Sequence, residues 1–128
     1  MEREFTKTLI DWKENNNKTP LMIIGARQTG KSYIVEEFCK QHFTSNIIIN
    51  LELEEDIREI FETTLKPEEI VRHIKLVKRI DFDIEDTVIF FDEIQTSERA
   101  ITSLKYFAES KENYKIITAG SLLRSEIK

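Results

Sequence analysis

The chain has 128 residues, of which 40% are apolar and 34% are charged, and its formal net charge at pH 7 is −5. This length fits one domain with a sizeable core, and the acidic balance argues against a protein that binds nucleic acid on its own. The apolar runs are much shorter than the ~20 residues of a membrane-spanning helix, no N-terminal signal pattern occurs, and the single Cys39 has no disulfide partner, so we expect a cytoplasmic protein.

The first part of the chain predicts a helix, a strand and a second helix. Apolar residues spaced four and three positions apart predict a helix over about Glu2–Lys13. The short apolar run Leu21–Ile24 follows a proline and predicts a strand that is buried on both faces. Apolar residues then return at helical spacing between Lys31 and His42, which predicts a helix that begins where a glycine-containing loop ends.

The rest of the chain continues this alternation. Its predicted strands are continuous apolar runs, which are typical of parallel sheets covered by helices on both faces. The sequence therefore predicts a single α/β domain, residues 1–128, with three layers in the order α/β/α. The expected segments are strands Asn46–Leu51, Thr87–Phe91 and Lys115–Ala119, helices over residues 53–61 and 70–77, and a further helix capped by Thr96 or Ser97.

A loop with the spacing of a phosphate-binding P-loop follows the first predicted strand. In such a loop, backbone N–H groups wrap the phosphates at a helix N-terminus, the lysine (Lys31) reaches the outer phosphates, and the hydroxyl of Ser32 binds magnesium. Arg27 has two readings, a contact with phosphate or a side chain that faces solvent. We predict a site for a nucleoside triphosphate with Mg²⁺. The loop consists of Gly25, Ala26, Arg27, Gln28, Thr29, Gly30, Lys31 and Ser32.

Two carboxylates follow a third apolar strand directly. Asp92 and Glu93 come at its carboxyl end, which is where ligands of parallel sheets bind. We expect Asp92 to hold magnesium and Glu93 to polarise the water that attacks the terminal phosphate. The alternative is a solvated strand end, and the nearby P-loop favours the catalytic interpretation.

Polar residues also end the other two predicted strands. Ser121 follows the fourth strand, where its hydroxyl could sense the terminal phosphate or orient the water; a helix-capping role is the alternative. Asn50 ends the second strand, and we hypothesise that it donates a hydrogen bond to Glu93.

Four segments together resemble the AAA-type ATPase domain of a prokaryotic family whose members carry an additional C-terminal domain of ill-defined function. The resemblance covers essentially the whole chain. It implies that strand Lys115–Ala119 lies between the P-loop strand and the strand that ends at Phe91, with Asn46–Leu51 outermost. The segments are Gly25–Ser32, Asn50–Glu52, Phe90–Gln95 and Thr118–Leu123.

Members of that family continue beyond the last of these segments, with a fifth strand and a helical lid that bears a sensor arginine. The present sequence stops at Lys128. Without the fifth strand, the P-loop strand would lie at an open sheet edge. We therefore expect either a fragment of a longer protein or half of an assembly in which a neighbour, a partner or a second copy in a homo-oligomer, covers that edge.

The predicted function is an ATP- and Mg²⁺-binding ATPase core that hydrolyses ATP slowly in isolation. An arginine supplied by a neighbour is worth about 10³–10⁵ in rate, and Arg99 and Arg124 are only candidates for this role. The alternatives are a nucleotide-binding switch without productive turnover and, less favoured, a phosphotransferase. The sequence lacks a guanine-specific motif, which together with the resemblance favours ATP over GTP.

Overall fold

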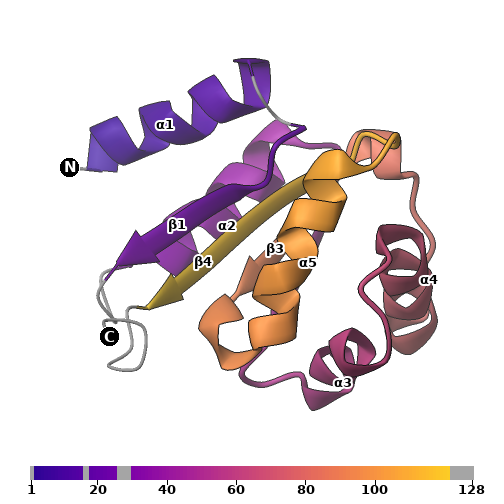
Figure 1. Ribbon diagram of the computed structural model, residues 1–128. Helices are drawn as coiled ribbons and strands as arrows, with labels where there is room; N and C mark the ends of the chain where they lie inside the picture. The colour runs from indigo at the N-terminus through magenta and orange to yellow at the C-terminus, as the bar shows by residue number, and fades with distance from the viewer. Residues whose placement is uncertain (1, 16–17, 26–29, 122–128) are drawn as a thin grey trace.

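The structure is a computed structural model of the chain, and it describes residues 2–15, 18–25 and 30–121. Within these residues, strands and helices alternate, as expected (Figure 1). No helix in the described part is long and apolar enough to cross a membrane. The elements are α1 (Glu2–Asn15), β1 (Leu21–Gly25), α2 (Lys31–His42), β2 (Ser45–Asn50), α3 (Glu55–Thr63), α4 (Pro67–Lys78), β3 (Thr87–Asp92), α5 (Glu98–Glu109) and β4 (Lys115–Ser121), with short 3₁₀ turns η1 (Ile84–Asp86) and η2 (Ile94–Thr96).

The four described strands form one parallel sheet in the order β1-β4-β3-β2. This order confirms the arrangement that the resemblance implied, with β4 between β1 and β3. The register places Gly25 opposite Ser121 and Asn50 opposite Asp92. The carboxyl ends of all four strands therefore meet at one edge of the sheet, where the predicted site residues lie.

Helices cover both faces of the sheet, which confirms the three-layer α/β/α architecture. Every residue of β3 is buried, and successive side chains point to opposite faces. Val88 and Phe90 pack in an apolar cluster with α1 and α2, whereas Ile89 and Phe91 pack in a second cluster with α3, α4 and α5. By the same alternation, Asp92 lies on the face that α2 covers.

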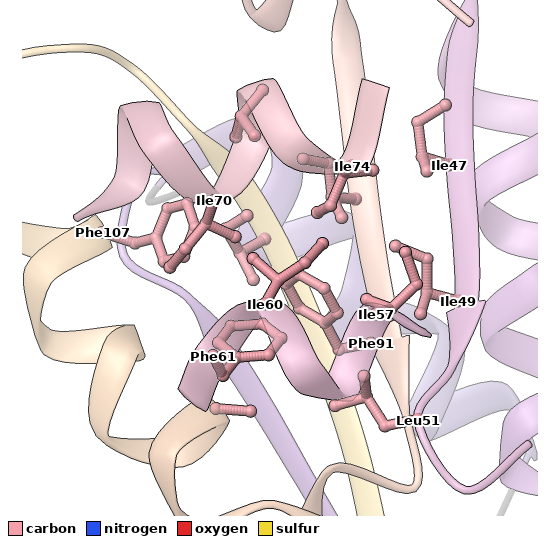
Figure 2. Packing of buried hydrophobic residues seen from close by; sticks show 14 of the residues in the cluster. Ile47, Ile49, Leu51, Ile57, Ile60, Phe61, Ile70, Ile74, Phe91 and Phe107 are labelled. Atoms are coloured by element: carbon pink, nitrogen blue, oxygen red, sulfur yellow. The ribbon is translucent and has the colours of Figure 1, made fainter. Parts of the chain in front are cut away.

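The cluster on the α3, α4 and α5 side is the larger of the two. Figure 2 shows most of its residues. The rings of Phe61 and Phe91 meet edge to face with centroids 5.6 Å apart, and Phe107 and Tyr114 do the same at 5.1 Å. Such pairs add about 0.5–1.5 kcal/mol to the stabilisation from burial. This packing fixes β3, and with it the position of the carboxylates at its end.

Strand β1 differs from the expectation that both its faces are buried. Only Ile23 is buried, whereas Met22 and Ile24 are 41% and 47% exposed. By the alternation of side chains, Met22 and Ile24 point to the face that α3, α4 and α5 cover, and the apolar cluster on that face includes no residue of β1, the outermost described strand. Both exposed side chains therefore lie on a face of β1 that the described helices cover only in part.

Candidate functional site

The described part of the P-loop consists of its two ends. Ala26, Arg27, Gln28 and Thr29 lie outside the described residues, so the predictions for them stay predictions. Gly30 directly precedes α2 and has φ 82°, a left-handed conformation that glycine adopts without the steric cost of a Cβ atom.

Lys31, the first residue of α2, packs against the end of β1. A Cβ atom added to Gly25 would overlap with Nζ of Lys31. A side chain at this position would therefore displace the lysine. The lack of a side chain at Gly25 lets the ammonium lie beside the backbone where the loop begins, which suits a cation that meets phosphates held by that loop.

Ser32 and Asp92 meet although they are 60 positions apart in the sequence. The hydroxyl Oγ of Ser32 donates a hydrogen bond to Oδ1 of Asp92 at 3.0 Å, which joins the start of α2 to the end of β3. A hydroxyl and a carboxylate are hard oxygen ligands of the kind that Mg²⁺ prefers. The pair therefore fits a magnesium ion held between a P-loop and a neighbouring strand.

Asp92 is a buried carboxyl group, with 6% of its surface exposed. Burial raises its pKa, because the charged form loses solvation; the nearby carboxylates of Glu93 and Glu52 raise it further. Hydrogen bonds from the Ser32 hydroxyl and from the N–H of Glu93, at 2.9 Å, oppose this increase. The net direction is upward, so the charged form lacks full compensation and is suited to a cation.

Glu93 has a left-handed backbone conformation, with φ 55° and ψ 46°. For a residue other than glycine this costs about 1–2 kcal/mol. Three hydrogen bonds stabilise the conformation: its N–H donates to Oδ1 of Asp92, and its carbonyl oxygen accepts from the N–H of Thr96 at 3.2 Å and from the Thr96 hydroxyl at 2.8 Å. Strain that the surroundings enforce in this way is common at functional sites.

Gln95, for which the sequence predicted no role, contacts both Glu93 and Ser121. Its amide nitrogen donates to Oε1 of Glu93 at 2.7 Å, and its amide oxygen accepts from the N–H of Ser121 at 3.2 Å. The feature of the sequence that could have indicated a role for Gln95 is its position two residues after Glu93. Its link to Ser121 could be found only from the tertiary structure.

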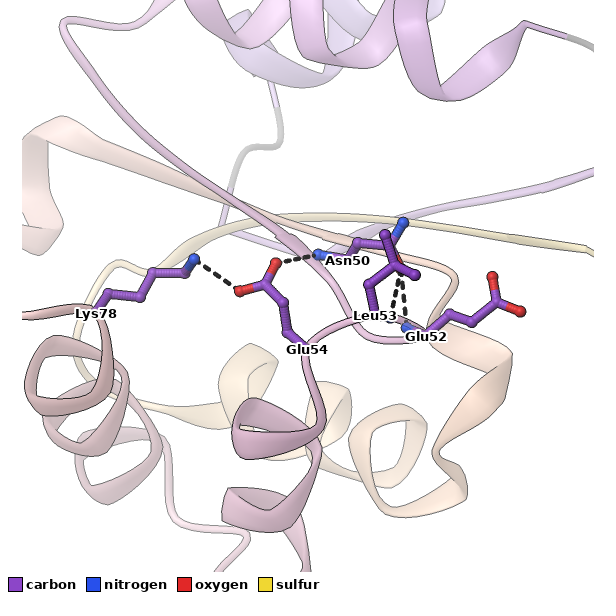
Figure 3. A network of polar contacts seen from close by, with 5 residues as sticks. All are labelled: Asn50, Glu52, Leu53, Glu54 and Lys78. Atoms are coloured by element: carbon purple, nitrogen blue, oxygen red, sulfur yellow. Dashed lines mark hydrogen bonds and ion pairs between the residues drawn. The ribbon is translucent and has the colours of Figure 1, made fainter.

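Asn50 does not fill the role that we hypothesised for it. Its side-chain oxygen accepts hydrogen bonds from the N–H groups of Glu52 and Leu53, at 2.9 and 3.1 Å, and so turns the chain after β2 (Figure 3). Its own N–H donates to Oε2 of Glu54 at 2.8 Å. No hydrogen bond joins Asn50 to Glu93 in the described part of the chain, where Glu93 is bonded to Gln95 instead.

The remaining predicted residues have different surroundings. Ser121 is buried at the end of β4, directly across the ladder from Gly25, and its predicted role stays a prediction. Arg99 donates from Nε to the carbonyl oxygen of Phe61, so it joins α5 to α3 within its own chain. Arg124 lies outside the described residues.

A family model described as an AAA domain matches residues 17–128. Among solved structures, the chain is similar to the Walker-type ATPase PABY2304 of Pyrococcus abyssi, with a TM-score of 0.58 and 21% sequence identity. The match covers 94% of this chain and 45% of that one, so the present chain spans less than half of the length of this relative. At this identity the likeness concerns the fold. No curated protein matches the chain.

Proposed function

We propose that this chain, which belongs to the AAA domain family, binds ATP with Mg²⁺ at the carboxyl ends of its strands and hydrolyses the ATP slowly. One observation carries the proposal: the hydroxyl of Ser32 at the start of α2 lies 3.0 Å from the buried carboxylate of Asp92. Lys31, the residue before Ser32, packs over Gly25 at the start of the loop. A cationic group and two oxygen ligands are thus gathered at one helix N-terminus.

The binding roles follow from the chemistry of these groups. The ammonium of Lys31 neutralises charge on the outer phosphates, and the backbone N–H groups of the loop from Gly25 to Ser32 wrap them. Ser32 and Asp92 hold Mg²⁺, directly or through water. A bound Mg²⁺ supplies positive charge that stabilises the phosphate oxygens during hydrolysis.

Hydrolysis depends on Glu93 and Ser121 in this proposal. The carboxylate of Glu93 accepts a hydrogen bond from the attacking water and orients it toward the terminal phosphate. Ser121, at the end of the adjacent strand β4, contacts the same phosphate or water. The restrained backbone of Glu93 supports the proposal, because a general base has to be held in a fixed geometry.

The need for an arginine from a neighbouring molecule supports slow ATP hydrolysis by the isolated chain. An arginine from a neighbouring molecule is worth about 10³–10⁵ in rate, and Arg99 is already bonded within its own chain. Strand β1 is outermost among the described strands, and its side chains Met22 and Ile24 are exposed. Both observations support a further part of the proposal, that a partner or a second copy covers this side of the sheet in a cytoplasmic assembly.

The test is hydrolysis of ATP by the parent chain and by Glu93→Gln, with Mg²⁺ present. We expect slow release of phosphate by the parent and a decrease of at least about 100-fold in the variant, as is typical when a group that stabilises the transition state is removed. Glu98→Gln is the matched control, since Glu98 is an exposed carboxylate five positions away at the start of α5. ATP binding without hydrolysis in the parent would favour a nucleotide-binding switch instead.

A further inference from the structure

The side chain of Gln95 connects two residues that the proposed function uses. One end of its amide donates to the carboxylate of Glu93 at 2.7 Å, and the other end accepts from the backbone N–H of Ser121 at 3.2 Å. Ser121 in turn lies across the ladder from Gly25, where the P-loop begins. Gln95 therefore links the carboxylate that would orient water to the end of the strand beside the P-loop.

Gly120 leaves the space in which the amide oxygen of Gln95 lies. A Cβ atom at Gly120 would come within 2.7 Å of that oxygen and within 3.3 Å of Cγ2 of Ile94. Ile94 is buried, so it has little room to move away. A side chain at position 120 would therefore have to displace the amide of Gln95 from its present position.

Different hydrogen bonds fix the backbone and the side chain of Glu93. Those with Asp92 and Thr96 fix its backbone, which they hold in the left-handed conformation. They leave rotation about the side-chain bonds of Glu93 free. In the described structure, the hydrogen bond from Gln95 is the interaction that fixes the carboxylate itself.

From this geometry we infer that Gln95 is a positioning residue: it holds the Glu93 carboxylate at a fixed place relative to the end of β4 during ATP hydrolysis. The inference rests on the proposed function, because it assigns Gln95 a role through Glu93. If the inference holds, the rate of ATP hydrolysis depends on Gln95. The affinity for ATP does not depend on Gln95, because neither of its hydrogen bonds involves Lys31, Ser32 or Asp92.

The first test compares Gln95→Ala and Gly120→Ala with the parent chain. We expect the single-turnover rate of ATP hydrolysis to fall about 10- to 100-fold in both variants, since small displacements of reacting groups have effects of this size. The affinity for ATP and Mg²⁺, measured by calorimetry, should stay within about twofold. The matched control is Gln41→Ala, which removes an exposed glutamine from α2 and should change neither quantity. An unchanged or increased rate in Gln95→Ala would overturn the inference.

The second test separates positioning from a general structural effect. In a Glu93→Gln background, Gln95→Ala should cause no further decrease in rate, because the carboxylate on which Gln95 acts is already absent. An equal decrease in both backgrounds would mean that Gln95 acts independently of Glu93, which contradicts the inference.

A spectroscopic readout tests the hydrogen-bonded bridge separately from catalysis. It distinguishes the two failures if the parent chain and Glu93→Gln hydrolyse ATP at the same rate, the result that would remove the catalytic part of the proposed function. The side-chain NH₂ signals of Gln95 in a nitrogen–proton NMR spectrum should then shift in Glu93→Ala, and the backbone signal of Ser121 should shift in Gln95→Ala. The side-chain signals of Gln41 serve as the control. If the Gln95 and Ser121 signals do not move, the bridge is absent and the inference is wrong.

Discussion

Two adjacent residues of β3, Phe91 and Asp92, belong to regions of opposite character. Phe91 is fully buried among apolar side chains from α3, α4 and α5, and its ring meets that of Phe61 edge to face. Asp92 is nearly as buried, but it is a carboxyl group on the other face of the strand, and its burial raises its pKa. The apolar cluster thus stabilises the fold, whereas the site one residue later carries an energetic cost.

The site depends on the core for its geometry. A desolvated carboxylate and a left-handed glutamate are both unfavourable, and they persist only where the surrounding structure enforces them. Strand β3 supplies this constraint, because all six of its residues are buried and it lies between two neighbours, β2 and β4. Substitutions in the two regions should therefore have opposite effects on stability.

The largest effect is expected in the apolar cluster. Phe61→Ala should lower the free energy of unfolding by about 3–5 kcal/mol, because it removes a fully buried ring and leaves a cavity. Denaturation in urea measures this change. Leu53→Ala is the control, since Leu53 is 78% exposed and its removal should change stability by no more than about 0.5 kcal/mol. A loss below about 1 kcal/mol for Phe61→Ala would contradict this account of the core.

In the site, removal of a charge should raise stability. Asp92→Asn keeps an oxygen that can accept the hydrogen bonds of Ser32 and Glu93, but it removes the buried charge. Because the pKa of Asp92 is raised in the folded state, ionisation at neutral pH destabilises the fold relative to the unfolded chain. The increase in stability from Asp92→Asn should be present above the pKa of Asp92 in the folded protein. It should disappear as the pH falls through that pKa toward 3.8, the ordinary pKa of an aspartate.

Thermal unfolding of parent and variant from neutral pH down to about pH 3.5 measures this dependence. Asp81→Asn is the opposite control, because Asp81 is exposed and a hydrogen bond from Lys75 lowers its pKa. Asp81→Asn should not raise the melting temperature at neutral pH. A lower melting temperature of Asp92→Asn at neutral pH would contradict the cost that we assign to the buried charge.

A smaller effect is expected for the ion pair between Lys78 and Glu54, which joins α4 to the turn after β2 (Figure 3). Nζ of Lys78 lies 2.7 Å from Oε1 of Glu54, but the side chains of Lys78 and Glu54 remain 26% and 32% exposed. Lys78→Ala should therefore cost no more than about 1 kcal/mol in urea denaturation. Lys40→Ala, an exposed lysine on α2, provides the baseline. A loss of about 3 kcal/mol or more, as for a broken buried pair, would show that this contact is part of the core.

The smallest expected effect is the reaction of Cys39 with iodoacetamide. This thiol lies on the buried face of α2, and burial raises its pKa to about 12, so the reactive thiolate is scarce in the folded protein. Alkylation at pH 8, followed by mass spectrometry, should be negligible until denaturant is added. Rapid labelling of the native chain would show that this cluster opens more readily than its packing implies.

Sequence patterns were sufficient for the elements of the fold because apolar periodicity reports burial directly. The prediction for β1 was wrong, because an apolar run does not reveal whether the helices on each face of the sheet extend over that strand. It also overlooked Gln95, whose partner Ser121 is 26 positions away. Asn50 was assigned to Glu93 from its place at the sheet edge, but the local turn with Glu52 and Leu53 uses its side-chain oxygen.

The most direct test of the central claim is a calorimetric titration of the chain with ATP and Mg²⁺, in parallel with Lys31→Ala and Lys40→Ala. Lys40 is an exposed lysine on the same helix as Lys31 and is the matched control. We expect binding by the parent chain and by Lys40→Ala, and its loss in Lys31→Ala. Absence of binding by a folded parent chain, or equal binding by all three proteins, would contradict a nucleotide site at the start of α2.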